Sequence, residues 1–222
     1  MRRDYYVEVE WVPFELHPEI PPEGLHRDVL GRRTPEGVRE HLYTLAAEAG
    51  LALQSNPIVA NGHKGLEAAE WAREQGPETF DRVHRALFAA YFGESRNIST
   101  AEQVIEALAA QAIPTAGLAE ALAAETYAAR IDEYTTLARQ NGISSTPTFI
   151  LDDRYSIPGA QDYLVFASAL TRLGVPRRPD AAPLPGPDTA LLSGDAPAPG
   201  AGPRADRADP GEDAVIDPDS IG

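Results

Sequence analysis

Residues 6–14, YVEVEWVPF, alternate apolar with acidic side chains. Val7, Val9 and Trp11 fall on one face of this alternation, which has the two-residue period of a half-buried β-strand. The proline-rich residues 17–24 then predict an extended loop, because proline has no N–H group to donate to a sheet. We therefore expect the chain to open with a strand.

A block of helical patterns follows, with apolar positions every three or four residues and capping signals at the ends. The predicted helices cover approximately residues 34–50, 63–75, 77–91, a segment opened by a capping-box pattern at 99–102, a short segment from 115, and 125–141. After this block, residues 148–151 and 155–157 predict a strand hairpin, and residues 161–173 predict a last helix. This order predicts an α/β, thioredoxin-like fold with a helical insertion at about 34–140.

One unit of that fold is not visible in the sequence. A thioredoxin core begins with a strand, a helix and a second strand, and only the second strand is recognisable here, so we expect the first strand and the active-site helix to be missing. That first strand is central in the sheet. Losing a strand of ~5 residues forfeits on the order of 5 kcal/mol of hydrogen bonding, against a domain stability of ~5–15 kcal/mol. We expect marginal stability unless another segment or a partner fills the gap.

The composition changes at residue 177, where proline, glycine, alanine and aspartate begin to dominate. Residues 179–222 contain nine acidic and two basic side chains, which is a net charge of -7 out of -15 for the chain. Such a segment buries too little apolar surface to offset its ordering entropy. We predict a domain over residues 1–176 and a disordered tail over 177–222, with partner docking by the tail as the alternative.

Charge and residue usage narrow the classes of function. A net charge of -15 repels nucleic acids and anionic membranes, and the sequence contains no apolar run of the ~20 residues that cross a bilayer. We expect a cytoplasmic protein without nucleic-acid or membrane partners. The chain has no cysteine and five histidines without close spacing, so we expect no metal site and no cofactor.

Four sequence blocks carry a resemblance to a known family. They are VEVEWVPFELHPEIPPEG at 7–24, NGHKGLEAAEWA at 61–72, LFAAYFGESRNIS at 87–99 and GISSTPTFILDDRYSIPGAQ at 142–161. In this order they resemble the FrnE-type branch of the DsbA superfamily, over about residues 5–174. The same branch is similar to the 2-hydroxychromene-2-carboxylate isomerases and the kappa-class glutathione transferases.

The resemblance implies a C-x-x-C pair at the start of a helix that would precede Arg2. A helix N-terminus lowers the pKa of a thiol and so favours the reactive thiolate. No such residues are present, and the serine position of the isomerase relatives is absent with them. We therefore predict that this chain has no catalytic residues for thiol exchange and is inactive in it.

The remaining candidates are substrate-binding residues, namely Thr146, Pro147, Asn61 and His63. The resemblance implies a cis bond at Pro147, beside which the backbone pairs with an extended substrate; alternatively, this bond only directs the loop into the next strand. Asn61 and His63 fall where related enzymes present polar groups to substrate. A capping role for Asn61 and a surface or capping role for His63 are the alternatives.

Three functions remain open. The first is a FrnE-like protein disulfide oxidoreductase whose redox cysteines are absent from this chain, either because Met1 is a misplaced start or because the protein is a degenerate relative. The others are a non-catalytic thioredoxin-like protein that binds peptides or ligands, and a glutathione-dependent, 2-hydroxychromene-2-carboxylate isomerase-like enzyme. The expected partners are a protein thiol or disulfide, or a small thiol such as glutathione. Dimerisation is left open.

Overall fold

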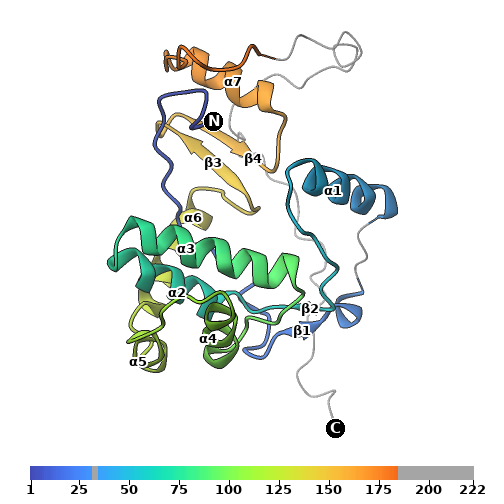
Figure 1. Ribbon diagram of the computed structural model, residues 1–222, viewed down its shortest axis with the longest axis vertical. Coiled ribbons are helices and arrows are strands. Elements are labelled where there is room, and N and C mark those ends of the chain that lie inside the picture. Colours follow the sequence, from blue (N-terminus) through green and yellow to red (C-terminus); the bar gives the residue numbers. More distant parts are fainter. Residues whose placement is uncertain (32–34, 185–222) are drawn as a thin grey trace, which may run out of the picture. The chain divides into compact units, whose positions relative to one another are not determined.

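A computed structural model describes residues 1–31 and 35–184 of the chain (Figure 1). In chain order its elements are β1 (Leu25–His26), the 3-10 helix η1 (Arg27–Leu30), α1 (Glu36–Glu48), β2 (Ile58–Val59), α2 (His63–Glu74), α3 (Pro77–Phe88), the π-helix η2 (Ala89–Gly93), α4 (Ala101–Ala110), α5 (Leu118–Ala123), α6 (Ala128–Gln140), β3 (Thr148–Leu151), β4 (Tyr155–Pro158) and α7 (Tyr163–Arg172). Residues 1–181 form one compact unit.

The main hydrophobic core lies where α2, α3, α4 and α5 pack together. Each helix contributes apolar side chains spaced three or four residues apart, which places them on one stripe. The buried members include Ala68, Trp71, Val83, Leu87, Val104, Leu108, Leu118 and Leu122. Fully burying a leucine or valine stabilises a fold by ~1.5–3 kcal/mol, so this core fixes α2, which carries the candidate site.

Strands β3 and β4 form the predicted hairpin, and α7 packs on it. Phe149 pairs with Ile157 across the hairpin. Asp152 and Asp153 have φ angles of 51° and 50°, as in the type I′ turn that matches strand twist. The Phe149 ring meets the Phe166 ring of α7 edge-on, with 4.8 Å between centroids. The predictions of this hairpin and of the last helix are confirmed.

The predicted strand over residues 6–14 is wrong, because the structure assigns no strand there. The adjacent Tyr5 forms an isolated antiparallel bridge with Arg177. Trp11 and Val12 remain 47% and 57% exposed. An alternating pattern becomes a strand only when a neighbouring strand accepts its backbone hydrogen bonds, and the described residues place no strand beside this segment.

One further local prediction needs correction, and two short strands escaped prediction. The capping box of α4 is formed by Thr100 and Gln103, one residue after the predicted pattern, while Ser99 is buried and its hydroxyl accepts the N–H of Asn61. Strands β1 and β2, which pair antiparallel, have only two residues each and therefore carry no readable alternation.

The chain remains hydrogen-bonded to the domain beyond residue 176, where the end of the domain was predicted. The N–H of Arg178 donates to the Asp4 carbonyl at 2.8 Å, so residues 177 and 178 belong to the unit that ends at Ala181. Most of the predicted tail, residues 185–222, lies outside the described part of the chain.

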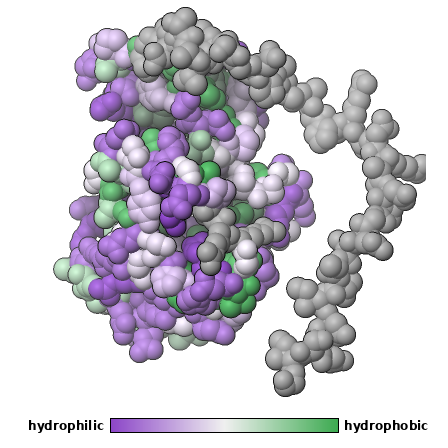
Figure 2. Space-filling view, turned by 90° about the vertical axis from the view of Figure 1, so that its right-hand side faces the viewer, coloured by the Kyte–Doolittle hydropathy of each residue, from purple (hydrophilic) through white to green (hydrophobic). Residues whose placement is uncertain are grey.

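The face shown in Figure 2 is largely hydrophilic, with hydrophobic side chains in small groups between the polar ones. Within residues 1–31 and 35–184, every helix is too short or too polar to traverse a lipid bilayer.

Candidate functional site

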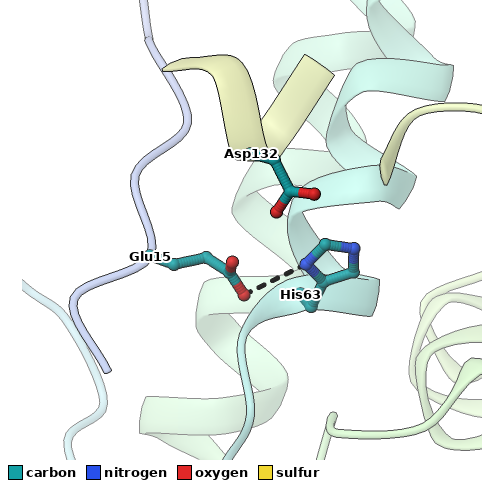
Figure 3. Close-up of side chains that lie close together, drawn as sticks. All are labelled: Glu15, His63 and Asp132. Atoms are coloured by element: carbon teal, nitrogen blue, oxygen red, sulfur yellow. Dashed lines mark hydrogen bonds and ion pairs between the residues drawn. The ribbon is translucent and has the colours of Figure 1, made fainter. Parts of the chain in front are cut away.

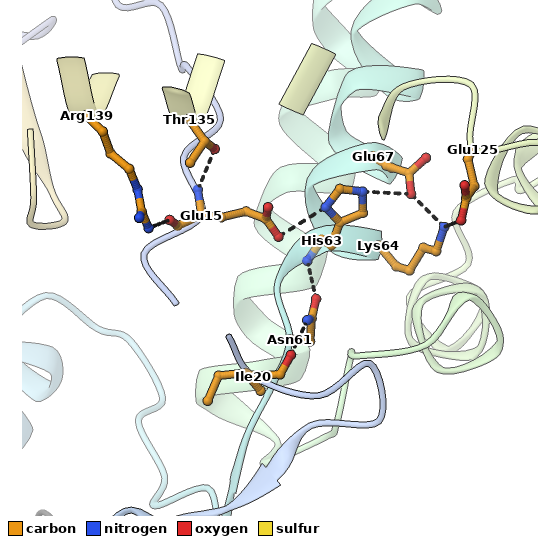
Figure 4. A network of polar contacts seen from close by, with 9 residues as sticks. All are labelled: Glu15, Ile20, Asn61, His63, Lys64, Glu67, Glu125, Thr135 and Arg139. Atoms are coloured by element: carbon orange, nitrogen blue, oxygen red, sulfur yellow. Dashed lines mark hydrogen bonds and ion pairs between the residues drawn. The ribbon is translucent and has the colours of Figure 1, made fainter. Parts of the chain in front are cut away.

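The candidate site lies at the first residue of α2, where Asn61 and His63 lie next to each other (Figure 4). The Asn61 side-chain oxygen accepts the His63 N–H at 3.0 Å, and its amide nitrogen donates to the Ile20 carbonyl at 2.6 Å. Both ends of the Asn61 amide are therefore occupied by the protein itself. This geometry is that of a residue that begins a helix and ties it to a loop.

His63 lies between two buried carboxylates. Its Nδ1 is 3.1 Å from Glu15 Oε1, and its Nε2 is 3.5 Å from Glu67 Oε1. The hydrogen bond to Glu15 raises the pKa of His63 above its usual value, although partial burial opposes this rise. The two acids favour the protonated, cationic form of the imidazole between them.

Glu15 is held against α6 through its backbone. Its N–H donates to the Thr135 hydroxyl oxygen at 3.1 Å, and its carbonyl accepts from Arg139 at 3.2 Å. Asp132 precedes Thr135 by three residues and so lies on the same face of α6. Figure 3 shows Glu15 and Asp132 on the same side of the imidazole of His63. One ligand atom from each of these three residues lies within 4.8 Å of the other two.

Glu67 is fully buried on α2. Its Oε1 accepts from the Lys64 ammonium at 2.7 Å, and Lys64 also pairs with Glu125 at 3.7 Å. The other oxygen of Glu67, Oε2, is buried and has no hydrogen-bond partner among the described residues. A buried carboxylate needs compensating charge, and the Lys64 ammonium supplies it to Oε1 of Glu67.

A second charged network joins α2 to α6 further along both helices. Arg130 pairs with Glu70 and Glu74, each at 3.4 Å, and the Tyr127 hydroxyl donates to Glu74 at 2.7 Å. Burial, and then the hydrogen bond to Glu74, raises the pKa of Tyr127 to about 12. Tyr127 is therefore neutral at physiological pH, and this network has a structural role in holding α6 against α2.

The other two predicted site residues lie at the start of β3. The Thr146–Pro147 peptide bond is cis, and the Pro147 carbonyl accepts the Gly159 N–H at 2.7 Å. Hydrogen-bonded and non-bonded pairs alternate along an antiparallel hairpin. The backbone groups of Phe149 therefore point to β4, and those of Thr148 and Ile150 point away from it. No described strand pairs with that outer edge of β3.

The predicted residues thus form two groups. Neither Thr146 nor Pro147 forms a hydrogen bond or ion pair with Asn61 or His63 within the described chain. A shallow hollow lies between the segment around Glu15 and the segment leading to Thr146. It is lined by Phe14, Leu16, Arg139, Ile143 and Ser144.

Three aromatic side chains are partly exposed in the structure. Trp11, Phe88 and Phe92 are 47%, 52% and 43% exposed. His84 lies between the rings of Trp11 and Phe88, with centroid distances of 4.5 Å and 4.8 Å. His84 and Phe88 are four residues apart and so lie on one face of α3, and part of this face lacks a covering element among the described residues.

The acidic members of the site are absent from the sequence-based candidates. Glu15, Glu67 and Asp132 come from a loop and two different helices, and Glu15 is 48 residues from His63. The expectation of no metal site rested on spacing between histidines, whereas the cluster combines one histidine with two carboxylates. The four-residue spacing of His63 and Glu67 on a predicted helix was the only local signal.

The model of a DSBA-like thioredoxin domain matches residues 1–171. The chain therefore belongs to the DsbA-like thioredoxin family. A crystal structure of a probable DsbA oxidoreductase from Streptomyces coelicolor is similar to this DsbA-like protein, with a TM-score of 0.66 and 23% identity over 82% of this chain and 83% of the other. None of the curated proteins matches the chain. The predicted thioredoxin-like fold with its helical insertion is confirmed for this DsbA-like domain.

Proposed function

We propose that this DsbA-like domain serves FrnE-like protein disulfide chemistry by binding an extended polypeptide along the outer edge of β3. The observation that carries the proposal is this edge, which pairs with no strand of the described residues and where the backbone groups of Thr148 and Ile150 point away from β4. An extended peptide that adds to a sheet edge gains affinity from main-chain hydrogen bonds and specificity from side-chain contacts.

The side chains on β3 suit such a substrate. Phe149 packs against α7 through Phe166, so Ile150, the next residue, faces the opposite side of the strand. Ile150 is 48% exposed and offers an apolar contact to a polypeptide laid beside it. This proposal makes an unfolded or extended protein segment the substrate.

The sulfur chemistry must come from outside these residues. Disulfide exchange begins with attack by a thiolate, and residues 1–222 contain no cysteine. An insulin-reduction assay on the 222-residue chain should therefore show no rate above buffer. A robust rate would contradict this assignment of the chemistry.

The absence of cysteine also favours a second candidate, a binding protein that uses the same edge without exchange. Sequencing the coding DNA upstream of Met1 separates the two functions. An in-frame C-x-x-C supports disulfide chemistry in the longer protein, whose additional strand would then compete with the peptide for the β3 edge. An in-frame stop codon supports the binding protein.

Peptide binding itself can be measured by fluorescence anisotropy. A labelled extended peptide with serine in place of cysteine should bind the wild-type chain. Ile150→Pro removes the outward N–H and retains the hydrogen bonds to β4, because proline is tolerated at a strand edge; we expect at least about tenfold weaker binding.

Ile150→Val is the matched control, because it keeps the N–H and a β-branched side chain. It should bind within about twofold of wild type, with circular dichroism confirming that both variants fold. Equal binding by the proline and valine variants, or no binding by wild type, would rule out the β3 edge as the peptide site.

A further inference from the structure

The cluster around His63 has a chemistry that peptide binding does not use. We propose that Glu15, His63 and Asp132 bind a first-row divalent transition-metal ion such as Zn²⁺. The ligand atoms are Nδ1 of His63 and one oxygen from each carboxylate. This inference is independent of the peptide site on β3.

The distances are close to those of a metal site. Ligand atoms at ~2.1 Å around a tetrahedral zinc lie ~3.4 Å from one another. Glu15 Oε1 and His63 Nδ1 are already 3.1 Å apart, and the atom from Asp132 completes a set within 4.8 Å. Asp132 is exposed and its side chain forms no hydrogen bond or ion pair with the described residues. A rotation of this side chain therefore closes the site without breaking another contact.

Glu67 provides a second, independent observation. Metal-binding histidines usually donate their other ring N–H to a carboxylate, which fixes the tautomer and the ring orientation. Glu67 Oε1 lies 3.5 Å from Nε2 of His63, and Glu67 is fully buried with its Oε2 unpartnered among the described residues. A proton on Nε2 leaves Nδ1 free to bind a metal on the side where Glu15 and Asp132 lie.

The charges around the imidazole also favour a cation. Three carboxylates surround His63, those of Glu15, Asp132 and Glu67. The positive charge beside them is the Lys64 ammonium, which is also paired with Glu125. Glu15 is itself buried, with 9% exposure. Burying carboxylates without full compensation is costly, and a divalent ion supplies two positive charges at the point where they converge.

The donor set indicates which ions fit. Mg²⁺ and Ca²⁺ prefer oxygen ligands alone, whereas an imidazole nitrogen favours Zn²⁺ and its first-row neighbours. Three protein ligands leave at least one coordination position for water or another small ligand. The expected preference is therefore Zn²⁺ or Co²⁺ over Mg²⁺ and Ca²⁺.

The test is a calorimetric titration of the full chain with Zn²⁺ after chelator treatment, supported by the visible absorption of Co²⁺. One equivalent of Zn²⁺ should bind, and Mg²⁺ or Ca²⁺ should not compete. His63→Gln should abolish binding, and Asp132→Asn should weaken it by at least about tenfold. Since Asp132 is exposed and its side chain is unpaired among residues 1–31 and 35–184, this second variant should fold even if His63→Gln does not.

His17→Gln is the matched control, because His17 pairs with Glu19 at 2.8 Å on an exposed surface. It should leave Zn²⁺ affinity within about twofold of wild type. The proposal is overturned if wild type binds no Zn²⁺, if Asp132→Asn binds as wild type does, or if His17→Gln loses as much affinity as His63→Gln.

Discussion

The hydrogen bond between Thr135 and the backbone of Glu15 makes the placement of the site testable. The hydroxyl oxygen of Thr135 accepts the Glu15 N–H at 3.1 Å, and the two residues are 8% and 9% exposed. Thr135→Val keeps the shape of the side chain and removes this acceptor. The Glu15 N–H would then be buried without a partner.

Leaving a buried donor unsatisfied costs about 1–3 kcal/mol. Threonine and valine have similar helix propensities, so the change contributes little through the helix itself. We therefore expect Thr135→Val to lower the free energy of unfolding by about 1–3 kcal/mol. Because Glu15 is a proposed metal ligand, the same variant should also bind Zn²⁺ more weakly.

Urea unfolding, followed by far-ultraviolet circular dichroism in the presence of a chelator, measures this loss. Thr136→Val is the matched control, since Thr136 is exposed on the same helix and its side chain forms no hydrogen bond with the described residues. This control should change the free energy of unfolding by no more than about 0.5 kcal/mol. Equal unfolding free energies for the two variants would refute the anchoring role of Thr135.

Three further predictions concern stability. In the presence of a chelator, wild type should have a higher free energy of unfolding than His63→Gln, and this difference should be fully present below pH 6.5 and shrink as the pH rises. The reason is that folding raises the pKa of His63 above 6.5. A difference that stays constant from acidic to alkaline pH in urea unfolding contradicts this prediction. Gln103→Ala should lower the free energy of unfolding by about 0.5–1 kcal/mol because it breaks the capping box, whereas Glu102→Ala should change it by only a few tenths of a kcal/mol. Thermal unfolding that ranks the two variants in the opposite order contradicts the capping box between Thr100 and Gln103. Tyr127→Phe removes a hydrogen bond to a half-exposed carboxylate and should cost about 0.5–1.5 kcal/mol in urea unfolding, and an unchanged midpoint would show that this bond contributes nothing.

Local patterns were sufficient to predict the elements that depend on local interactions. α2, α3 and α7 follow from apolar spacing and end signals, and the β3–β4 hairpin follows from its two short runs and the Asp152–Asp153 turn. Residues 6–14 carry an equally clear alternation and still form no strand, because strand pairing depends on a neighbour that no local pattern specifies.

The site was predictable only in part for the same reason. Asn61 and His63 were candidates because the family resemblance implies polar groups at these positions, at the start of a predicted helix. Glu15 reads as one polar residue in a proline-rich loop, and Asp132 as one acid on the polar side of a helix. Only the packing of α6 against the loop, through Thr135, brings these two acids to His63.

The most direct test of the proposed function is amide hydrogen exchange at Ile150 with and without a saturating extended peptide. We predict that exchange at Ile150 slows by about tenfold or more when its outward N–H pairs with the peptide, while Phe149, whose N–H faces β4, changes little. Unchanged exchange at Ile150 with the peptide fully bound would contradict the account.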